Sequence, residues 1–261
     1  VDGSGLFAPH VVAAMGGSAA PSMGTDGTGA RLMQALGHEI TPLYPALVQL
    51  RCSHPALKGL KGIRTQAELT LMIDDQAVLR ETGELLLTDY GVSGVCVFQL
   101  SREAAPALAQ GRSVRLAVNF LPEIPSLLPW LDARIRQLAP ASLLALTTGV
   151  LPRLLAQTVI REARLSPDMP AEALSESEKQ ALCGALSAFP LVITGTQGFA
   201  NAQVTRGGVS LADVDPSTMA SRLFDGLHII GELLDVDGPC GGYNLHFAFA
   251  GALAAAKAIA G

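Results

Sequence analysis

Short apolar runs that end in glycine occur near both ends of the chain, and helical periodicity follows each of them. Runs of this length bounded by glycine predict buried strands, and apolar positions that recur every three or four residues predict helices. The predicted strands are residues 11–15 and 227–230, and the predicted helices are residues 28–36 and 244–260. Both ends of the chain therefore predict the same arrangement, a buried strand that enters a glycine turn.

Residues 46–119 alternate short apolar and polar stretches with turn residues between them. This pattern predicts a mostly antiparallel β unit of the kind that can close into a small barrel. The predicted strands are residues 47–50, 66–73, 76–80, 85–88, 92–100 and 113–120, with turns at Asp74-Asp75 and Thr82-Gly83 and a short helix at 104–110.

Between residues 124 and 189 the apolar spacing lengthens to that of helices. The predicted helices are residues 126–137, 141–146, 151–163 and 175–188, and strands return at 191–194 and 202–205. Ser175 stands three residues before Glu178, which is the spacing of a capping box at the start of the last helix. This stretch predicts a helical subdomain.

The order of these elements predicts an α/β fold, α+β overall, that is interrupted by an insertion. Neither end is large enough to fold alone, so we expect residues 1–43 and 208–261 to form one discontinuous domain. The insertion then consists of a β unit over residues 44–120 and a helical subdomain with returning strands over residues 121–207.

The composition narrows the class of protein. Of the 261 residues, 49% are apolar and 16% are charged, which excludes a disordered chain. The chain holds 18 basic and 23 acidic residues, and the net charge of −5 provides no basic surface for a nucleic acid. No stretch reaches the roughly 18 apolar residues of a membrane helix. We therefore expect neither nucleic acid nor membrane as a partner.

Cysteine and histidine usage bears on compartment and metal content. The four cysteines are scattered without a CxxC pair, and the five histidines lack metal-ligand spacing. We expect reduced thiols in a cytoplasmic protein without a metal site. The oligomeric state is left open.

Two glycine clusters are the strongest candidates for chemistry. Gly16-Gly17 follows the first strand, and residues 231–244 follow the last strand and open the final helix. In doubly wound folds, ligands bind at the carboxyl ends of strands, where glycine lets the backbone approach closely. A helix N-terminus suits a phosphate or a heteroaromatic ring that becomes negative on reduction. The alternative is that both clusters are turns and helix caps, because neither is a GxGxxG motif between a strand and a helix.

Several stretches together resemble the FAD-dependent flavoprotein family that includes aminoacetone oxidase, whose members are often called NAD(P)/FAD-dependent oxidoreductases. The matching stretches are VVAAMGG at 11–17, GTDGTG at 24–29, LGH at 36–38, PALV at 45–48, GELLLT at 83–88, GVSG at 91–94, GGV at 207–209, TM at 218–219, GE at 231–232 and GGYNL at 241–245. They cover nearly the whole chain, in order.

The resemblance implies the C-terminal part of a two-dinucleotide-binding-type flavin fold, split by the inserted β unit and helical subdomain. It also implies that the family's N-terminal GxGxxG portion is absent, which agrees with Val1 at the first position instead of methionine. We therefore expect an FAD-dependent oxidoreductase acting on a small molecule, with NAD(P)H as a possible reductant. The 261 residues alone are expected to bind FAD weakly or not at all, so a non-catalytic fragment or binding module is the alternative. The substrate, and the choice between oxidase and reductase, stay open.

The resemblance also assigns residues to the cofactor. Gly231, Glu232 and Asp235 would lie along the ribityl-pyrophosphate arm, with Glu232 placed to bind a ribityl hydroxyl. Residues Gly241, Gly242, Tyr243, Asn244 and Leu245 would pass beneath the isoalloxazine ring, and Gly16 and Gly17 would pack against the cofactor. The protein would tune the flavin, which supplies the redox chemistry.

The resemblance offers one weak catalytic candidate, Asp89. The family usually has histidine at this position, and a histidine titrates near neutral pH whereas an ordinary aspartate is ionised. Cys240 precedes the predicted flavin loop without a second cysteine near it in the sequence, so we expect no redox-active disulfide there.

Overall fold

The two glycine-ended runs form strands that pair with each other. β1 (Val11–Ala13) runs parallel to β10 (Leu227–Ile229), with Val11 opposite Leu227 and Ala13 opposite Ile229. The prediction of a strand at each place is confirmed, although both strands are shorter than predicted. The pairing joins the beginning and the end of the chain in one unit.

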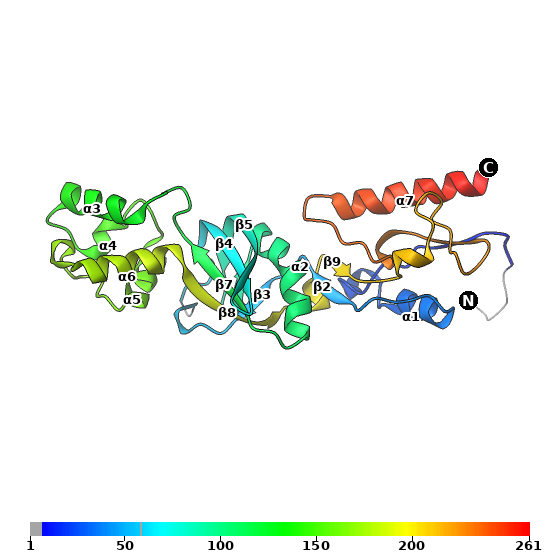
Figure 1. Cartoon of the computed structure of the whole chain (residues 1–261), viewed down its shortest axis with the longest axis horizontal. Helices are drawn as coiled ribbons and strands as arrows, with labels where there is room; N and C mark the ends of the chain where they lie inside the picture. Colours follow the sequence, from blue (N-terminus) through cyan, green and yellow to red (C-terminus); the bar gives the residue numbers. More distant parts are fainter. Residues whose placement is uncertain (1–6, 58) are drawn as a thin grey trace. The chain divides into compact units, whose positions relative to one another are not determined.

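The computed structural model describes residues 7–57 and 59–261, and Val1 lies outside the described residues. The chain divides into two compact units, which can be followed by colour in Figure 1. The first unit combines Val1–Val48 with Gln197–Gly261, and the second is Gln49–Thr196. The first unit is thus built from two distant pieces of sequence, whereas the second is continuous.

In the first unit, α1 (Thr28–Ala35) and α7 (Tyr243–Ala260) contribute to the same apolar core as β1 and β10. A second strand pair, β2 (Tyr44–Ala46) with β9 (Val204–Arg206), is antiparallel. The buried core residues are Ala13, Met33, Val209, Val214, Met219, Leu227, Ile229, Leu233, Leu234 and Ala255. The helices predicted at 28–36 and 244–260 are confirmed within a residue at each end.

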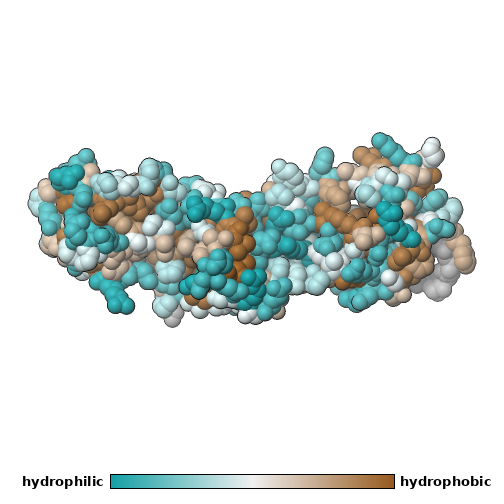
Figure 2. Space-filling model, in the orientation of Figure 1, coloured by the Kyte–Doolittle hydropathy of each residue, from teal (hydrophilic) through white to brown (hydrophobic). Residues whose placement is uncertain are grey.

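α7 carries apolar side chains on more than one face. It buries Gly251 and Ala255, whereas Leu245, Phe249 and Leu253, which are spaced four residues apart, are exposed. Figure 2 shows apolar residues gathered on the surface of this unit. Among the described residues, no helix combines the length and the apolar character needed to cross a membrane.

The second unit is built on a closed barrel, which confirms the predicted antiparallel β unit. Its strand order is β3-β6-β5-β4-β7-β8. The bounds are β3 (Leu50–Cys52), β4 (Arg64–Ile73), β5 (Gln76–Leu87), β6 (Gly91–Ser93), β7 (Val114–Asn119) and β8 (Phe189–Thr196). Along β7 every second side chain is buried, which is the pattern of a strand with one face in the core.

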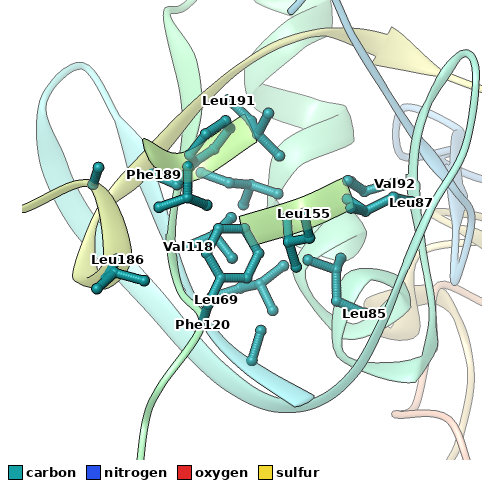
Figure 3. Close-up of a cluster of buried hydrophobic side chains, with 14 of the residues drawn as sticks. Leu69, Leu85, Leu87, Val92, Val118, Phe120, Leu155, Leu186, Phe189 and Leu191 are labelled. Carbon is teal, nitrogen blue, oxygen red and sulfur yellow. The ribbon is translucent and has the colours of Figure 1, made fainter. Parts of the chain in front are cut away.

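The helical subdomain lies in the chain between β7 and β8 and shares the core of the barrel. Its helices are α3 (Leu127–Leu138), α4 (Leu143–Leu146), α5 (Arg153–Glu162) and α6 (Glu176–Ser187). Phe120 follows β7 and Phe189 begins β8, so the two rings mark the ends of the helical subdomain. They meet edge to face, with ring centroids 5.6 Å apart. Figure 3 shows both rings in one apolar cluster with Leu155 of α5. All four predicted helices are present.

Short 3-10 helices complete the described secondary structure. They are Pro21–Met23, Pro55–Leu57, Ala171–Ala173, Phe199–Asn201, Leu211–Asp213 and Gly231–Leu233.

The strand predicted at 92–100 is wrong beyond residue 93. β6 ends at Ser93, and α2 (Val95–Ala109) begins after Gly94 and includes the short helix predicted at 104–110. The first turns of α2 bury Cys96, Val97 and Leu100 against the barrel, so its sequence reads as a continuous apolar run. A fully buried helix and a buried strand cannot be told apart by such a run.

Of the two turns predicted inside the barrel, one is confirmed and one is wrong. Asp74 and Asp75 have φ of 48° and 64° and connect β4 to β5. Thr82-Gly83 is not a turn, because β5 continues through it from Gln76 to Leu87. A Cβ at Gly83 would lie 3.5 Å from Cβ of Cys96 in α2. This glycine therefore marks the close approach of a helix to the strand and not a chain reversal.

The strand predicted at 47–50 is also wrong. β2 ends at Ala46 and β3 begins at Leu50, because Leu47 adopts a left-handed φ of 50° that breaks the extended backbone. The strand predicted at 202–205 begins two residues later, as β9.

The start of α6 generates a stability prediction. Ser175 Oγ accepts the Glu178 N–H at 3.3 Å, and a Glu178 carboxylate oxygen accepts the Ser175 N–H at 2.8 Å, which confirms the predicted capping box. Ser175→Ala should lower the free energy of unfolding by about 1 kcal/mol in a denaturant titration. Ser166→Ala, at an exposed loop position, is the control and should change little. Equal losses in both variants would contradict the prediction.

Candidate functional site

The first unit contains a pocket of about 540 Å³ at the carboxyl ends of β1 and β10. Its volume and its mainly apolar lining are typical of small-molecule sites. The lining residues are Ala14, Gly16, Leu47, Gln203, Val204, Ile230, Gly231, Glu232, Val236, Cys240, Gly241, Gly242, Asn244, Leu245, Phe247 and Ala248. All of them belong to the first unit.

The parallel pairing of β1 and β10 brings the two glycine clusters together. Both strands end at the same edge, and the chain turns sharply after each of them. Gly16 has a φ of 71° and Gly231 a φ of 68°, a left-handed conformation that glycine adopts without steric cost. The turns therefore expose backbone, and not side chains, on two sides of the pocket.

The start of α7 forms a third side of the pocket. Gly241 and Gly242 have φ of 121° and 95°, and no side chain caps the helix at Gly242. The Asn244 side chain secures the preceding loop, since its Oδ1 accepts the Gly238 N–H at 2.7 Å and its Nδ2 donates to the Gly238 carbonyl at 3.1 Å. The first turn of α7 contains no acidic residue, so no side-chain charge in that turn neutralises the positive end of the helix dipole.

Thr205 of β9 connects the loop after β1 with the loop after β10, behind the pocket. Its buried hydroxyl oxygen accepts the N–H of Ser18 at 2.7 Å and of Ala19 at 3.0 Å. Its own N–H donates to Glu232 Oε1 at 2.9 Å. Gly17 packs on this pair so closely that a Cβ there would lie 2.5 Å from Glu232 Oε1 and 2.7 Å from Cβ of Thr205.

Glu232 is a half-buried carboxyl with a perturbed pKa. Burial raises the pKa of this carboxyl, and the hydrogen bonds from Thr205 oppose the rise. Desolvation therefore outweighs hydrogen bonding at this position.

The structure gathers most of the residues that the sequence assigned to a cofactor, but not all. Those that line the pocket are Gly16, Gly231, Glu232, Gly241, Gly242, Asn244 and Leu245. Gly17 lies behind the pocket against Thr205. Asp235 donates its N–H to the Val209 carbonyl at 2.9 Å, and Tyr243 is 62% exposed; neither lines the pocket.

Several lining residues were not predicted from the sequence. Leu47 enters the pocket lining through the left-handed backbone that separates β2 from β3, and Gln203 and Val204 come with β9. Gln203 Oε1 lies 3.8 Å from the Cys240 sulfur. Thr205 was not predicted either. Its position shortly before the matched GGV stretch at 207–209 was the available signal, but a threonine in a strand does not by itself indicate a functional role.

Asp89 belongs to the second unit and is not among the pocket residues. It is exposed and pairs with Lys61 at 2.8 Å. The hydrogen bond and charge of Lys61 hold the pKa of the Asp89 carboxyl below its usual value. A role of Asp89 in proton transfer stays a prediction.

A parallel strand pair with glycine turns at its carboxyl edge, flanked by helices and interrupted by a barrel, defines a Rossmann-type unit with an insertion. The chain belongs to the HI0933-like protein Rossmann domain family, whose model matches residues 2–258.

Curated relatives carry two different names. The chain is 38% identical over 262 residues, 99% of its length, to the 3-dehydro-bile acid delta(4,6)-reductase of Clostridium scindens. It is 31% identical over 261 residues, 98% of its length, to the ribosomal RNA dihydrouridine synthase of Escherichia coli K12. The enzyme of that name from Haemophilus influenzae is 27% identical over 253 residues, 96% of the chain. The chain spans 64%, 62% and 60% of these relatives, respectively.

The close packing at Gly17 generates the first prediction for this site. Because φ of Gly17 is not left-handed, an added methyl group is opposed by Thr205 and Glu232 and not by backbone strain. Gly17→Ala should lower the free energy of unfolding by about 1–3 kcal/mol, as overpacking does. The control is Gly184→Ala in α6, where a Cβ meets nothing within 4 Å and alanine favours the helix. Denaturant titrations that show equal changes for both variants would exclude the steric explanation.

The raised pKa of Glu232 generates a second prediction. A carboxyl whose pKa is higher in the folded than in the unfolded chain reduces stability when ionised, and this cost vanishes as the pH falls below its ordinary value of 4.5. Glu232→Gln should therefore melt at a higher temperature than the wild type at pH 7. The difference should shrink as the pH falls through the pKa of the folded carboxyl.

The control for this prediction is Glu178→Gln in the capping box. Hydrogen bonds from Ser175 lower the pKa of Glu178, so this variant should be the less stable one at pH 7 and approach the wild type at low pH. Melting curves from pH 3 to 8 with the same sign for both variants would refute the assignment.

Proposed function

We propose that the protein is an FAD-dependent oxidoreductase that reduces a carbon–carbon double bond conjugated to a carbonyl group, and that the pocket of the first unit holds the flavin. The observation that carries this proposal is the convergence of two glycine turns and an uncapped helix start on one apolar pocket. Such a site receives a flat ring and stabilises negative charge at its edge.

The residues present fit a flavin. Gly231 and Glu232 would hold the polyol arm, because a carboxylate accepts hydrogen bonds from hydroxyl groups. The N–H groups at Gly241 and Gly242 would face the edge of the ring that becomes negative on reduction. Ala14, Val204 and Ile230 would cover the ring and exclude water. The flavin, when bound, supplies hydride-transfer chemistry.

The names of the relatives support reduction as the reaction. A delta(4,6)-reductase removes carbon–carbon double bonds, and dihydrouridine differs from uridine by two hydrogens across such a bond, so both names describe the same change. This proposal departs from an oxidase of the aminoacetone type, which the sequence left open, and it uses NAD(P)H as the reductant.

A small carbonyl compound is the substrate class that the charge of this chain favours over RNA. The net charge of −5 offers no excess of cations for phosphates. We therefore propose a small-molecule substrate and no nucleic-acid partner.

A reducing compartment such as the cytoplasm agrees with the state of the cysteines. Cys52, Cys96, Cys183 and Cys240 are thiols in the structure. Burial raises the pKa of the Cys52 thiol to about 12, so it stays protonated and unreactive at neutral pH.

The proposal is tested by titrating the purified protein with FAD and following the visible absorbance band of bound flavin. The flavoprotein should then be reduced anaerobically by NADH or NADPH and reoxidised by a 3-oxo-4-ene steroid, but not by its saturated counterpart. Reoxidation by an RNA transcript, or reduction by aminoacetone in place of NAD(P)H, would overturn the proposed substrate class. The absence of FAD binding at millimolar cofactor would overturn the proposal for this chain in favour of the alternative left by the sequence, a non-catalytic fragment or binding module. Weak binding would agree with the expectation from the sequence.

A matched pair of variants separates the pocket from general stability. Gly231 and Gly149 both have left-handed φ, of 68° and 77°, and alanine strains either by roughly 1 kcal/mol. Gly231→Ala should weaken FAD binding about tenfold or more, whereas Gly149→Ala, in the second unit, should lose stability but keep the affinity. Equal affinities in the two variants would argue against the pocket.

A further inference from the structure

Every hydrogen-bonding capacity of the Thr205 hydroxyl is used. A threonine hydroxyl has two acceptor lone pairs and one donor. The lone pairs accept the Ser18 and Ala19 N–H groups, and the proton is donated to the Glu232 carboxylate. The side chain is 0% exposed, so water cannot replace any of these partners.

These contacts fix a side chain that would otherwise be free to rotate. Glu232 receives both the hydroxyl proton and the backbone N–H of Thr205, the latter on Oε1 at 2.9 Å. Glu232 itself lines the pocket, next to Gly231. Gly17 closes the remaining space beside Oε1. Thr205 and Gly17 thus hold this carboxylate in place at the wall of the pocket.

The same residue also sets the position of the first glycine turn. Ser18 and Ala19 follow Gly16 and Gly17 directly, and their N–H groups donate to Thr205, which lies 187 and 186 residues away in sequence, respectively. No regular strand pairing connects residues 16–19 to β9, because β9 pairs with β2. The hydroxyl of Thr205 therefore takes the place of a backbone acceptor between the two loops.

We propose that Thr205 is a positioning residue: it holds the 16–19 loop and the Glu232 carboxylate together so that Glu232 presents its carboxylate to a hydroxyl group of the bound ligand. The chemical class of that ligand group is a polyol, and its assignment to the flavin rests on the proposed function above.

The test compares Thr205→Val, which removes the hydroxyl but keeps the shape and the backbone N–H, with Thr205→Ser, which restores the hydroxyl. The control is Thr147→Val in the second unit, where a buried hydroxyl donates to the Leu144 carbonyl at 2.7 Å. All three variants are titrated with FAD, and the Glu232 carboxyl carbon is titrated with acid by NMR in the absence of FAD.

Thr205→Val should weaken FAD binding roughly tenfold, the equivalent of one hydrogen bond to a charged group. It should also move the pKa of Glu232 further upward, because a donor to the ionised form is lost. Thr205→Ser should restore both properties. Thr147→Val should lose stability while leaving both unchanged. A double variant with Glu232→Gln should bind FAD no more weakly than the weaker single variant, since both act through one contact.

Two results would overturn the positioning role. One is a Glu232 pKa that is the same in Thr205→Val and wild type. The other is an FAD affinity that falls equally in Thr205→Val and Thr147→Val, which would show a loss of stability alone. If the wild-type protein binds no FAD, the proposed function fails, and the acid titration without cofactor still decides whether Thr205 holds Glu232.

Discussion

The parallel pairing of β1 with β10 is the contact on which the candidate site depends. It aligns two strands from opposite ends of the sequence so that both glycine turns leave the same edge. The start of α7 then meets this edge, and Leu47, Gln203 and Val204 complete the pocket lining. The strands are only three residues long, so packing of Ala13 and Ile229 in the core, rather than the few ladder hydrogen bonds, holds the alignment.

The pocket combines groups of opposite electrostatic character. The start of α7 carries partial positive charge without an acidic residue to neutralise it, whereas Glu232 is a carboxylate whose ionised form is disfavoured by burial. Both groups line the same pocket, where a ligand can contact each of them.

The sequence predicted the helices and strands better than the segments where one element ends and the next begins. Apolar periodicity and the Ser175–Glu178 spacing located most helices, and alternation located the barrel, because these signals are local. The errors at 47–50, 82–83 and 92–100 occur where tertiary contacts decide the backbone: Leu47 is left-handed, and Gly83 makes room for α2. For the site, glycine clusters were visible in the sequence, but the role of Thr205 depends on residues far away along the chain.

The discontinuity of the first unit has a consequence for how the protein is made. During synthesis, β1, α1 and β2 emerge from the ribosome well before their partners β9, β10 and α7. The barrel can close in the meantime, and the pairing of Leu50 with Thr196 then brings the two ends of the insert next to each other. A long flexible connection is thereby replaced by a short one. This lowers the conformational entropy lost when β9, β10 and α7 pack against β1, α1 and β2. Once folded, the second unit therefore holds the two segments of the first unit close together in space, so that they can assemble over a short distance.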